Sequence, residues 1–280
     1  MVTSDLSTVI ITPEWPQSVR IPYSALRSRR DKPVELTNGL QASIFDMHVH
    51  TNGASSDSTL DPDELPSIAQ EAGLTGVNIS EHDKVWEIGR QSAYRSRHPS
   101  LVVNFAMEIS TDLGHMIAIG LTEYIGGIQK VEKLREALDD VGGFLIVAHP
   151  FRHVFDPVTA MRTGKEPFNL SPSEAAELEV FQLVDAIEIA NASNTLRENE
   201  FASEVAEIRG LPGSGGSDAH SASGIGGFAT GFEQEISSPN QLLEELHAGR
   251  FEAVHRTPDL RIVRFETGSM EAVAEETNHT

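Results

Sequence analysis

The 280-residue chain contains no cysteine, and this absence limits its chemistry. Disulfide bonds and thiolate metal sites are both excluded, so any metal ion must be held by histidine, aspartate or glutamate. The chain also lacks a run of about 18 apolar residues, which argues against a membrane span. Its first residues, Met1–Asp5, do not show the basic and then apolar order of a secretory signal. We therefore expect a cytoplasmic protein without a membrane partner.

Basic residues are scarce as well. The chain has 21 basic and 42 acidic residues, and its formal net charge is −21. A solvated acidic surface accounts for most of this excess, although some carboxylates could instead converge on cations. No broad basic surface for following a nucleic-acid backbone is evident, so stable nucleic-acid binding is not expected. A small phosphorylated substrate would have to be attracted by metal ions and a few local arginines.

The chain divides into three parts by composition. Residues 1–40 form an N-terminal extension, residues 41–266 carry the regular pattern of a domain, and residues 267–280 are a flexible acidic tail. The extension contains a basic cluster, which is either a solvated turn or a contact for phosphate or a polymer. The members of this cluster are Arg27, Arg29, Arg30 and Lys32. No oligomeric state is predicted.

From Ile44 onward, short apolar segments alternate with amphipathic helices. The clearest helices are expected at 61–72, 86–97, 130–141, 171–180, 196–209 and 239–249. Strands are expected at 44–47, 76–80, 101–106, 116–119, 144–148, 186–189 and 213–217. This alternation predicts an α/β fold, with a parallel sheet, open or closed, and helices outside it.

Histidines and carboxylates recur where the predicted strands end. His48 and His50 share one face of the first strand with Asp46, because side chains alternate along a strand. A single His-x-His pair is weak evidence for a metal site, but the pattern returns at the later strands. The residues concerned are His82, Glu108, His115, His149, Glu188, Asp218 and His220. In a barrel these strand ends lie on one rim, where converging carboxylates require cations between them.

These residues resemble the motifs of the PHP family, the polymerase and histidinol phosphatase superfamily. The resemblance runs from about Phe45 to Val254. It rests on Asp46–Thr51, Ser56-Asp57, Ser80–Asp83, Glu108, Ala148–Pro150 and Ser217–His220, in the order found in that family. It implies a distorted (β/α)7 barrel with a short N-terminal extension, a site for two or three metal ions, and hydrolysis of phosphoric esters.

The resemblance also implies a ligand for each position. His48 and His50 would bind one metal ion together with Glu108 and Asp218. Glu108 would bridge to a second ion, which His149 also binds.

Asp57, His82 and His220 would complete the cluster, with Asp57 and His82 on the ion nearest the surface. His115 is either a further ligand or a residue that packs behind the ligands.

The chain departs from the family pattern at a few positions without losing a ligand. Ser80-Glu81-His82-Asp83 stands where Thr-Asp-His-Asp is usual, and Ser58 replaces a glycine after Asp57. Glu81 has a longer arm than the usual aspartate, but that position is not expected to be a ligand. Ala106 replaces a glycine two residues before Glu108.

Nitrogen and oxygen ligands without sulfur suit Zn, Mn or Fe. Two such ions about 3.5–4 Å apart would share a hydroxide that attacks phosphorus in line. Asp83 is a candidate for orienting a ligand or carrying a proton, or else it makes a loop hydrogen bond. Arg152 is expected to grip a phosphate. His153 and Lys84 are candidate substrate contacts, or exposed loop residues.

Two further features bear on the expected site. Glu188 is expected to hold a basic group or a ligand rather than a metal ion. The loop 155–172, with Arg162 and Lys165, is long enough to be a lid that selects the substrate.

The function expected first is hydrolysis of a phosphomonoester of a small metabolite or nucleotide. A nuclease that cleaves oligonucleotide phosphodiesters is the main alternative. An amidohydrolase also begins with His-x-His in a barrel, but in that superfamily a lysine typically bridges the metal ions, and this chain has Glu108 at that place. A metal-binding regulator without catalysis would not need the complete ligand set.

The predicted cluster leads to a direct test. We expect His48→Ala or Asp218→Asn to abolish turnover and lower the bound metal, measured by elemental analysis, while circular dichroism shows an intact fold. Full activity in metal-stripped wild-type protein would contradict the prediction.

Overall fold

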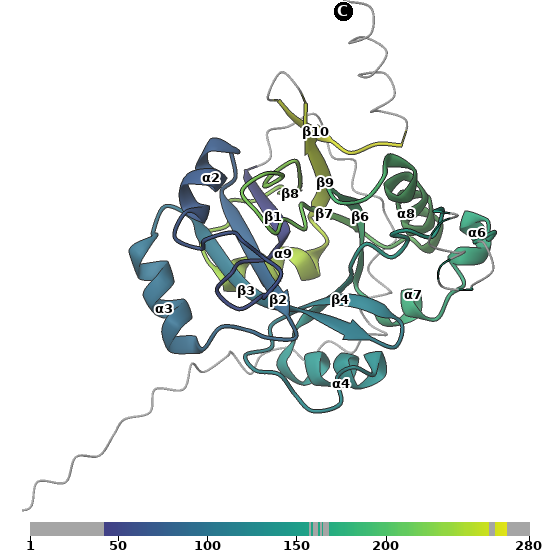
Figure 1. Cartoon of the computed structure of the whole chain (residues 1–280), viewed down its shortest axis with the longest axis horizontal. Coiled ribbons are helices and arrows are strands. Elements are labelled where there is room, and N and C mark those ends of the chain that lie inside the picture. Colours follow the sequence, from purple (N-terminus) through teal and green to yellow (C-terminus); the bar gives the residue numbers. More distant parts are fainter. Residues whose placement is uncertain are drawn as a thin grey trace, which may run out of the picture. The chain divides into compact units, whose positions relative to one another are not determined.

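Ten strands of the described residues form a single mixed sheet in the order β10-β9-β8-β1-β2-β3-β4-β5-β6-β7 (Figure 1). The structure is a computed structural model that describes residues 42–156, 158, 162, 164, 168–257 and 261–267. The predicted extension with its basic cluster, Lys165 of the predicted lid, and the predicted tail beyond residue 267 lie outside these residues.

The strands and helices have the following bounds. The strands are β1 Ser43–Val49, β2 Gly76–His82, β3 Val102–Thr111, β4 Gly114–Ile119, β5 Phe144–Val147, β6 Ala186–Asn191, β7 Gly213–Gly216, β8 Phe228–Phe232, β9 Phe251–Arg256 and β10 Ile262–Arg264. The helices are α2 Leu65–Glu71, α3 Ile88–Arg97, α4 Val131–Val141, α6 Pro172–Ala175, α7 Val180–Leu183, α8 Leu196–Arg209 and α9 Pro239–Ala248. Within the described ranges, no helix has the length and apolar character needed to cross a membrane.

The sheet is mixed α/β, but its pairing departs from a regular repeat of parallel strands. The strands β1, β2 and β3 are parallel, as are β5, β6 and β7, whereas β4 is antiparallel to both of its neighbours. Only Asp112 and Leu113 separate β3 from β4, and a parallel crossover needs a dozen or more residues. The strands β8, β9 and β10 add antiparallel pairs beyond β1, which the sequence pattern did not predict.

The sheet curls so that β7, at one edge, approaches the end of β1. A parallel bridge joins Val49, at the end of β1, to Ala219, just after β7. The backbone N–H of His50 donates to the carbonyl of Ala219 at 3.0 Å, and that of Asp218 donates to the carbonyl of His48 at 2.7 Å. These bonds bring two motifs that are about 170 residues apart in sequence onto one rim.

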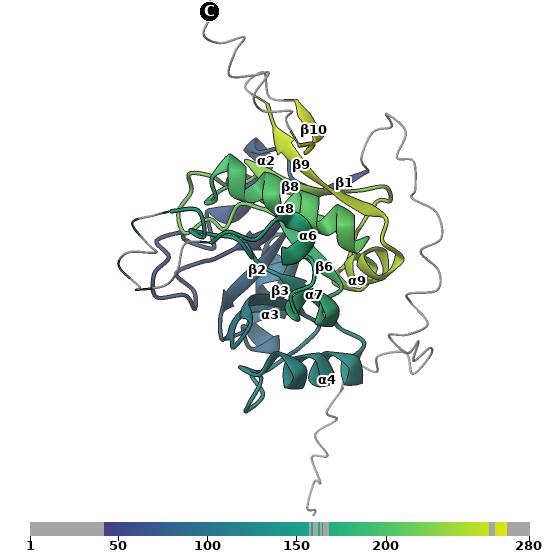
Figure 2. The ribbon, with the colours of Figure 1, turned by 90° about the vertical axis from the view of Figure 1, so that its right-hand side faces the viewer.

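Helices cover the outside of the curled sheet (Figures 1 and 2). The helices α2 and α3 contribute Leu65 and Tyr94 to a buried cluster with residues of β1, β2 and β3. The helices α4, α7 and α8 contribute to a second cluster with β3 to β6. The helix α9 places Leu242 and Leu246 in a third cluster with Phe45 and Phe144, from the starts of β1 and β5. This third cluster lies at the ends of the strands opposite the histidines.

Most predicted helices are confirmed, including α4, α8 and α9 within a residue or two. The helices α8 and α9 begin at capping residues, Thr195 with Glu198 in a capping box and Ser238 with Pro239 at the first turn. The single helix predicted over 171–180 is wrong, because a turn at 176–179 splits it into α6 and α7. The turn lets Val180 and Phe181 join the core.

Two glycines allow a test of how tightly β7 packs. A Cβ on Gly215 would run into the backbone carbonyl of Ala229 in β8, whereas one on Gly89, in α3, would meet nothing within 4 Å. We expect Gly215→Ala to lower the free energy of unfolding by about 1–3 kcal/mol, as overpacking does. Gly89→Ala should raise it by up to about 1 kcal/mol, because alanine favours a helix.

Urea unfolding of the two variants measures both effects. The account of β7 is wrong if Gly215→Ala is as stable as the wild type.

Candidate metal centre

Four side chains from three strands form a first group in the most buried part of the rim. The Nε2 atoms of His48 and His50 lie 3.0 Å apart. Glu108 Oε2 is 3.4 Å from the first and 3.2 Å from the second, and Asp218 Oδ1 is 3.4 Å and 3.3 Å away. All four side chains are at most 3% exposed. Their ligand atoms lie within 4.8 Å of one another, close enough to surround a single cation.

The other oxygen of Glu108 belongs to a second group. Glu108 Oε1 is 2.8 Å from Nδ1 of His115 and 2.9 Å from Nε2 of His149. One carboxylate therefore presents an oxygen to each of two groups, as a bridging ligand does. The sequence left two roles open for His115, a metal ligand or a residue that packs behind the ligands. In the structure a ring nitrogen of His115 faces the shared carboxylate.

A third group lies nearer the solvent. His82 Nε2 is 3.1 Å and His220 Nε2 is 3.3 Å from Asp57 Oδ2, and Nδ1 of His82 is 3.0 Å from Glu108 Oε2. The side chains of His82 and Asp57 are 33% and 54% exposed, in contrast to the buried first group. The structure thus brings together every residue that the sequence predicted as a ligand.

Hydrogen bonds behind the histidines fix which ring nitrogen faces the cluster. Nδ1 of His48 donates to Glu188 Oε1 at 3.0 Å, and Nδ1 of His220 donates to the backbone carbonyl of Asp218 at 3.0 Å. Each bond occupies the proton on Nδ1, so Nε2 is the atom that points into the cluster. Glu188 also accepts from the backbone N–H of His149 and from Asn191, so it supports ligands, as expected.

The donor set fits divalent cations. Glu108 Oε2 and Asp218 Oδ1 are buried, and neither has a hydrogen-bond partner among the described residues. Buried carboxylate oxygens without partners are costly, and here they face the Nε2 atoms of His48 and His50. Imidazole nitrogen and carboxylate oxygen without sulfur suit Zn, Mn or Fe.

Protons take part of the cations' place in the metal-free chain. Burial alone would lower the pKa of His48, but the carboxylates of Asp218, Glu188 and Glu108 outweigh it and raise that pKa well above its ordinary value. Burial would likewise raise the pKa of Glu108, but the charge of His48 and bonds from His115 and His149 hold it well below its usual range. A metal ion therefore has to displace a proton from His48.

Four non-glycine residues of the described chain have a positive φ, and all follow strands at this rim. They are Asp83 (50°), His149 (29°), His153 (61°) and Asp218 (53°). Such backbone conformations cost on the order of 1–3 kcal/mol each and concentrate at functional sites. The strain turns His149 and Asp218 toward the cluster at the points where β5 and β7 end.

Arg152 binds Asp218, one of the candidate metal ligands. Its Nη2 donates to Asp218 Oδ2 at 2.5 Å and to Asn191 at 2.8 Å, and its Nε donates to Asn194 at 3.0 Å. Nη1 takes part in none of these bonds. His153 is exposed. Its backbone N–H donates to Glu198 at 2.5 Å, and its backbone carbonyl accepts from the N–H of Asp156 at 3.3 Å. The structure brings Arg152 to the cluster but not the side chain of His153.

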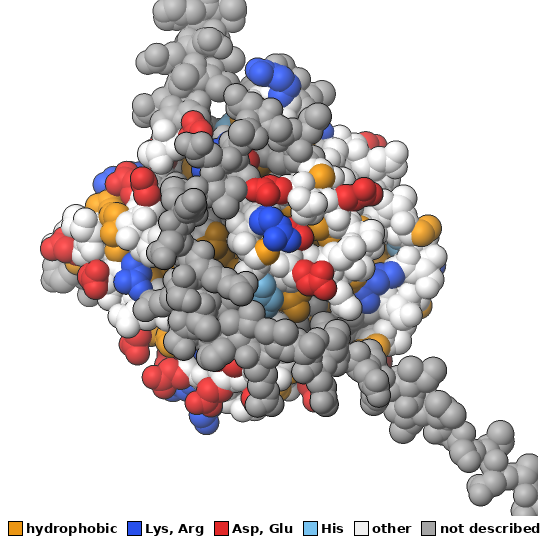
Figure 3. All heavy atoms as spheres, turned by 180° about the vertical axis from the view of Figure 1, so that it is seen from behind, with side chains coloured by type: hydrophobic (Ala, Val, Ile, Leu, Met, Phe, Trp, Pro, Cys, Tyr) orange, Lys and Arg blue, Asp and Glu red, His pale blue; other side chains and the backbone are white. Residues whose placement is uncertain are grey.

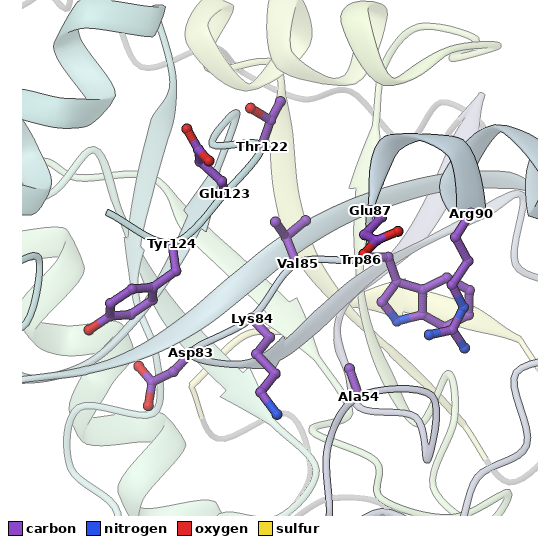
Figure 4. Close-up of a pocket in the computed structure, with 10 residues that line it drawn as sticks. All are labelled: Ala54, Asp83, Lys84, Val85, Trp86, Glu87, Arg90, Thr122, Glu123 and Tyr124. Carbon is purple, nitrogen blue, oxygen red and sulfur yellow. The ribbon is translucent and has the colours of Figure 1, made fainter. Parts of the chain in front are cut away.

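Asp83 and Lys84 line a separate hollow of about 530 Å³ (Figure 4). Asp83 lies on the same side of it as Tyr124, and its backbone N–H donates to the carbonyl of Glu108 at 2.9 Å. Trp86 is only 3% exposed, because Arg90 covers its ring at 3.5 Å. Trp86 is therefore a core residue and offers no face to a ligand.

Comparison with known proteins adds to this geometry. A family model described as PHP-associated matches residues 197–251, which run from α8 to β9 and include Asp218 and His220. Over this part, the chain resembles the PHP superfamily. The resemblance and the sulfur-free set of donor atoms indicate a metal-dependent hydrolase. No curated protein sequence matches the chain.

Three solved structures resemble this chain at low identity. PsfC from Pseudomonas syringae aligns with a TM-score of 0.51 and 16% identity, over 85% of this chain and 96% of its own, and supports the fold alone. A candidate metal-dependent phosphoesterase from Bifidobacterium adolescentis aligns at 0.43 and 18%, over 65% and 88%. An amidohydrolase from Chromobacterium violaceum with bound sulfate aligns at 0.46 and 14%, over 81% and 99%.

Some residues of this site were not predicted from the sequence. Asn194 positions Arg152, and Ser55 contacts a ring nitrogen of His50. Asn194 carried no signal beyond its place after a predicted strand. Ser55 could have been considered because it lies two residues before Asp57.

The raised pKa of His48 predicts how metal binding depends on pH. Because the carboxylates around His48 raise its pKa well above the ordinary value, zinc has to compete with a proton there, so the affinity for zinc should rise with pH. Calorimetric titrations in buffers of different ionisation enthalpy would measure the released protons.

Glu188→Gln removes one of the charges that raise this pKa, so it should reduce the proton release. A zinc affinity that is independent of pH would contradict the interpretation.

Proposed function

We propose that the chain is a metal-dependent phosphoesterase that hydrolyses a phosphomonoester of a small metabolite or nucleotide. The observation that carries this proposal is the sharing of Glu108 among three groups of donor atoms. Adjacent cation positions that share a carboxylate suit phosphoryl transfer, in which negative charge develops on several oxygens at once.

The proposal includes the distorted (β/α)7 barrel. The strands β1 to β7 would be its seven strands, with β4 reversed by the short hairpin after β3, and β8 to β10 would extend it beyond β1.

Two or three divalent ions, of Zn, Mn or Fe, would occupy the three groups. His48, His50, Glu108 and Asp218 would hold the inner ion. Glu108, His115 and His149 would hold the second, and Asp57, His82 and His220 the outer one. When bound, the ions supply an activated water and neutralise charge on the phosphoryl oxygens.

Arg152 would have two tasks in this reaction. Its bonds to Asp218, Asn191 and Asn194 fix both the guanidinium and the carboxylate. Nη1 then remains to donate to a phosphoryl oxygen, at a place defined by three other bonds.

Asp83 would serve as a proton carrier near the outer group, since its exposed side chain follows His82 directly. Lys84 and His153 would contact the part of the substrate beyond the phosphate.

The alternatives are less well supported. Figure 3 shows acidic side chains spread over one face of the chain, with basic ones single among them. A long nucleic-acid backbone would find little attraction on such a surface, which disfavours a nuclease. An amidohydrolase would need a bridging lysine, but in the described part of the chain no lysine contacts the three groups, and Glu108 takes the central place.

A phosphate-release screen over phosphorylated metabolites, with Mn²⁺ or Zn²⁺ supplied, tests the proposed function. We expect release that is abolished by chelators and restored by metal. Arg152→Lys should lower kcat/KM on the order of 100-fold, because the single ammonium group of lysine cannot both hold Asp218 and Asn191 and donate to the phosphoryl oxygen in the transition state.

Arg97→Lys is the matched control, because Arg97 pairs with Asp63 on the exposed surface and should leave the rate unchanged. Release of labelled fragments from oligonucleotides, without phosphate release from any monoester, would contradict the proposal in favour of a nuclease.

A further inference from the structure

Glu81 is a completely buried carboxylate beside the candidate centre, and it does not face the donor atoms. Its Oε1 accepts from the hydroxyl of Thr51 at 2.5 Å and from the indole N–H of Trp86 at 3.1 Å. Its Oε2 accepts from the hydroxyl of Ser55 at 2.5 Å and from the backbone N–H of Thr51 at 3.1 Å. Four donors thus satisfy both oxygens without a cation.

Ser55 connects this carboxylate to the centre. Its hydroxyl has one proton, which is given to Glu81, so it can only accept from its other partners. Those partners are Nδ1 of His50 at 3.4 Å and the backbone N–H of His82 at 3.3 Å. Nδ1 of His50 must therefore carry the ring proton, which leaves the lone pair of Nε2 directed at the donor atoms.

Glu81 also holds the segment that carries Asp57. Thr51 and Ser55 lie at the start of this segment, and the Ser58 hydroxyl ties its far end to the carbonyl of His50 at 2.9 Å. On the outer side, Arg90 covers the ring of Trp86 and donates to the carbonyl of Gly53 at 2.9 Å. Both ends of the segment are thereby fixed around Glu81.

We infer that Glu81 is a positioning residue. Through Ser55 it fixes the ring of His50, and through Thr51 and Ser55 it fixes the segment that presents Asp57. This inference rests on the proposed function, because it takes His50 and Asp57 to be metal ligands.

The length of the glutamate matters to this role. An aspartate would be one methylene shorter and would not reach Thr51, Ser55 and Trp86 together. The substitution Glu81→Asp should therefore act in the same direction as Glu81→Gln, even though it keeps the charge.

Metal binding by the full-length protein provides the first test. In zinc titrations, we expect Ser55→Ala, Glu81→Gln and Glu81→Asp to bind zinc roughly 10- to 100-fold more weakly than the wild type, as is typical when a residue behind a ligand is changed. Asp185→Asn is the matched control. Asp185 is a buried carboxylate that accepts from Arg135 and from the backbone of Leu145, away from the centre, so zinc affinity should be unchanged even if stability falls.

Nuclear magnetic resonance of the metal-free protein provides a second test that does not depend on metal or activity. The proton on Nδ1 of His50, assigned by its loss in His50→Asn, should be visible in the wild type and in Asp185→Asn. It should be lost in Ser55→Ala, where its acceptor is gone. If a Glu81 variant fails to fold, Ser55→Ala still decides the question, because it removes only one hydroxyl.

The outcomes separate the two proposals. If Ser55→Ala keeps both the wild-type zinc affinity and the Nδ1 proton, the positioning role is wrong, whatever the function. If His50→Asn binds zinc as well as the wild type, the ligand assignment of the proposed function fails, and the positioning role fails with it. Weaker zinc binding in Ser55→Ala, together with loss of the proton, supports both.

Discussion

The carboxylate of Glu108 lies at the centre of the candidate site, and much of the surrounding structure serves to compensate its charge. It is almost completely buried, and nitrogens of His50, His82, His115 and His149 lie within 3.2 Å of its two oxygens. A buried negative charge of this kind is costly unless it is paired or binds a metal. Beside this carboxylate the pKa values of His48 and His82 are raised above their ordinary value. Divalent cations would meet the same requirement more completely, since each brings two charges into the same small space.

The scaffold has to hold these groups together against their own repulsion. It does so with bonds from backbone and side chains that do not depend on a cation. The bridge from Val49 to Ala219 closes the sheet, and Asp46 accepts from the backbone N–H groups of Ser217 and Gly226. Positive φ angles at His149 and Asp218 are the local cost of turning ligands inward. The third apolar cluster, at the opposite ends of the strands, balances that cost with well-packed side chains.

The sequence predicted which side chains converge better than it predicted the sheet. Histidines and acids at the ends of apolar segments are a strong signal, and the structure brings every predicted ligand together, from Asp57 to His220. The strands β8 and β9 were missed because Phe228–Phe232 contains glycine and alanine and carries little strand signal. Trp86 lies beneath Arg90, four residues further along the chain, and also packs against Phe105 of β3, a contact that the local sequence does not show. The bonds between Glu81, Ser55 and His50 join residues up to 26 positions apart, so no local pattern reveals them.

The stacking of His50 has a consequence for how ions would be distributed. Its ring lies between those of His82 and His220, with centroids 4.3 Å from each, so it has little freedom to turn. In the proposed arrangement the ring serves the inner ion with His48, although its ligand atom also lies within 4.8 Å of those of His82 and His220. The ring offers a single lone pair toward both. An outer ion would therefore have to rely on Asp57 in its place, so unequal affinities at the two positions would follow from the arrangement.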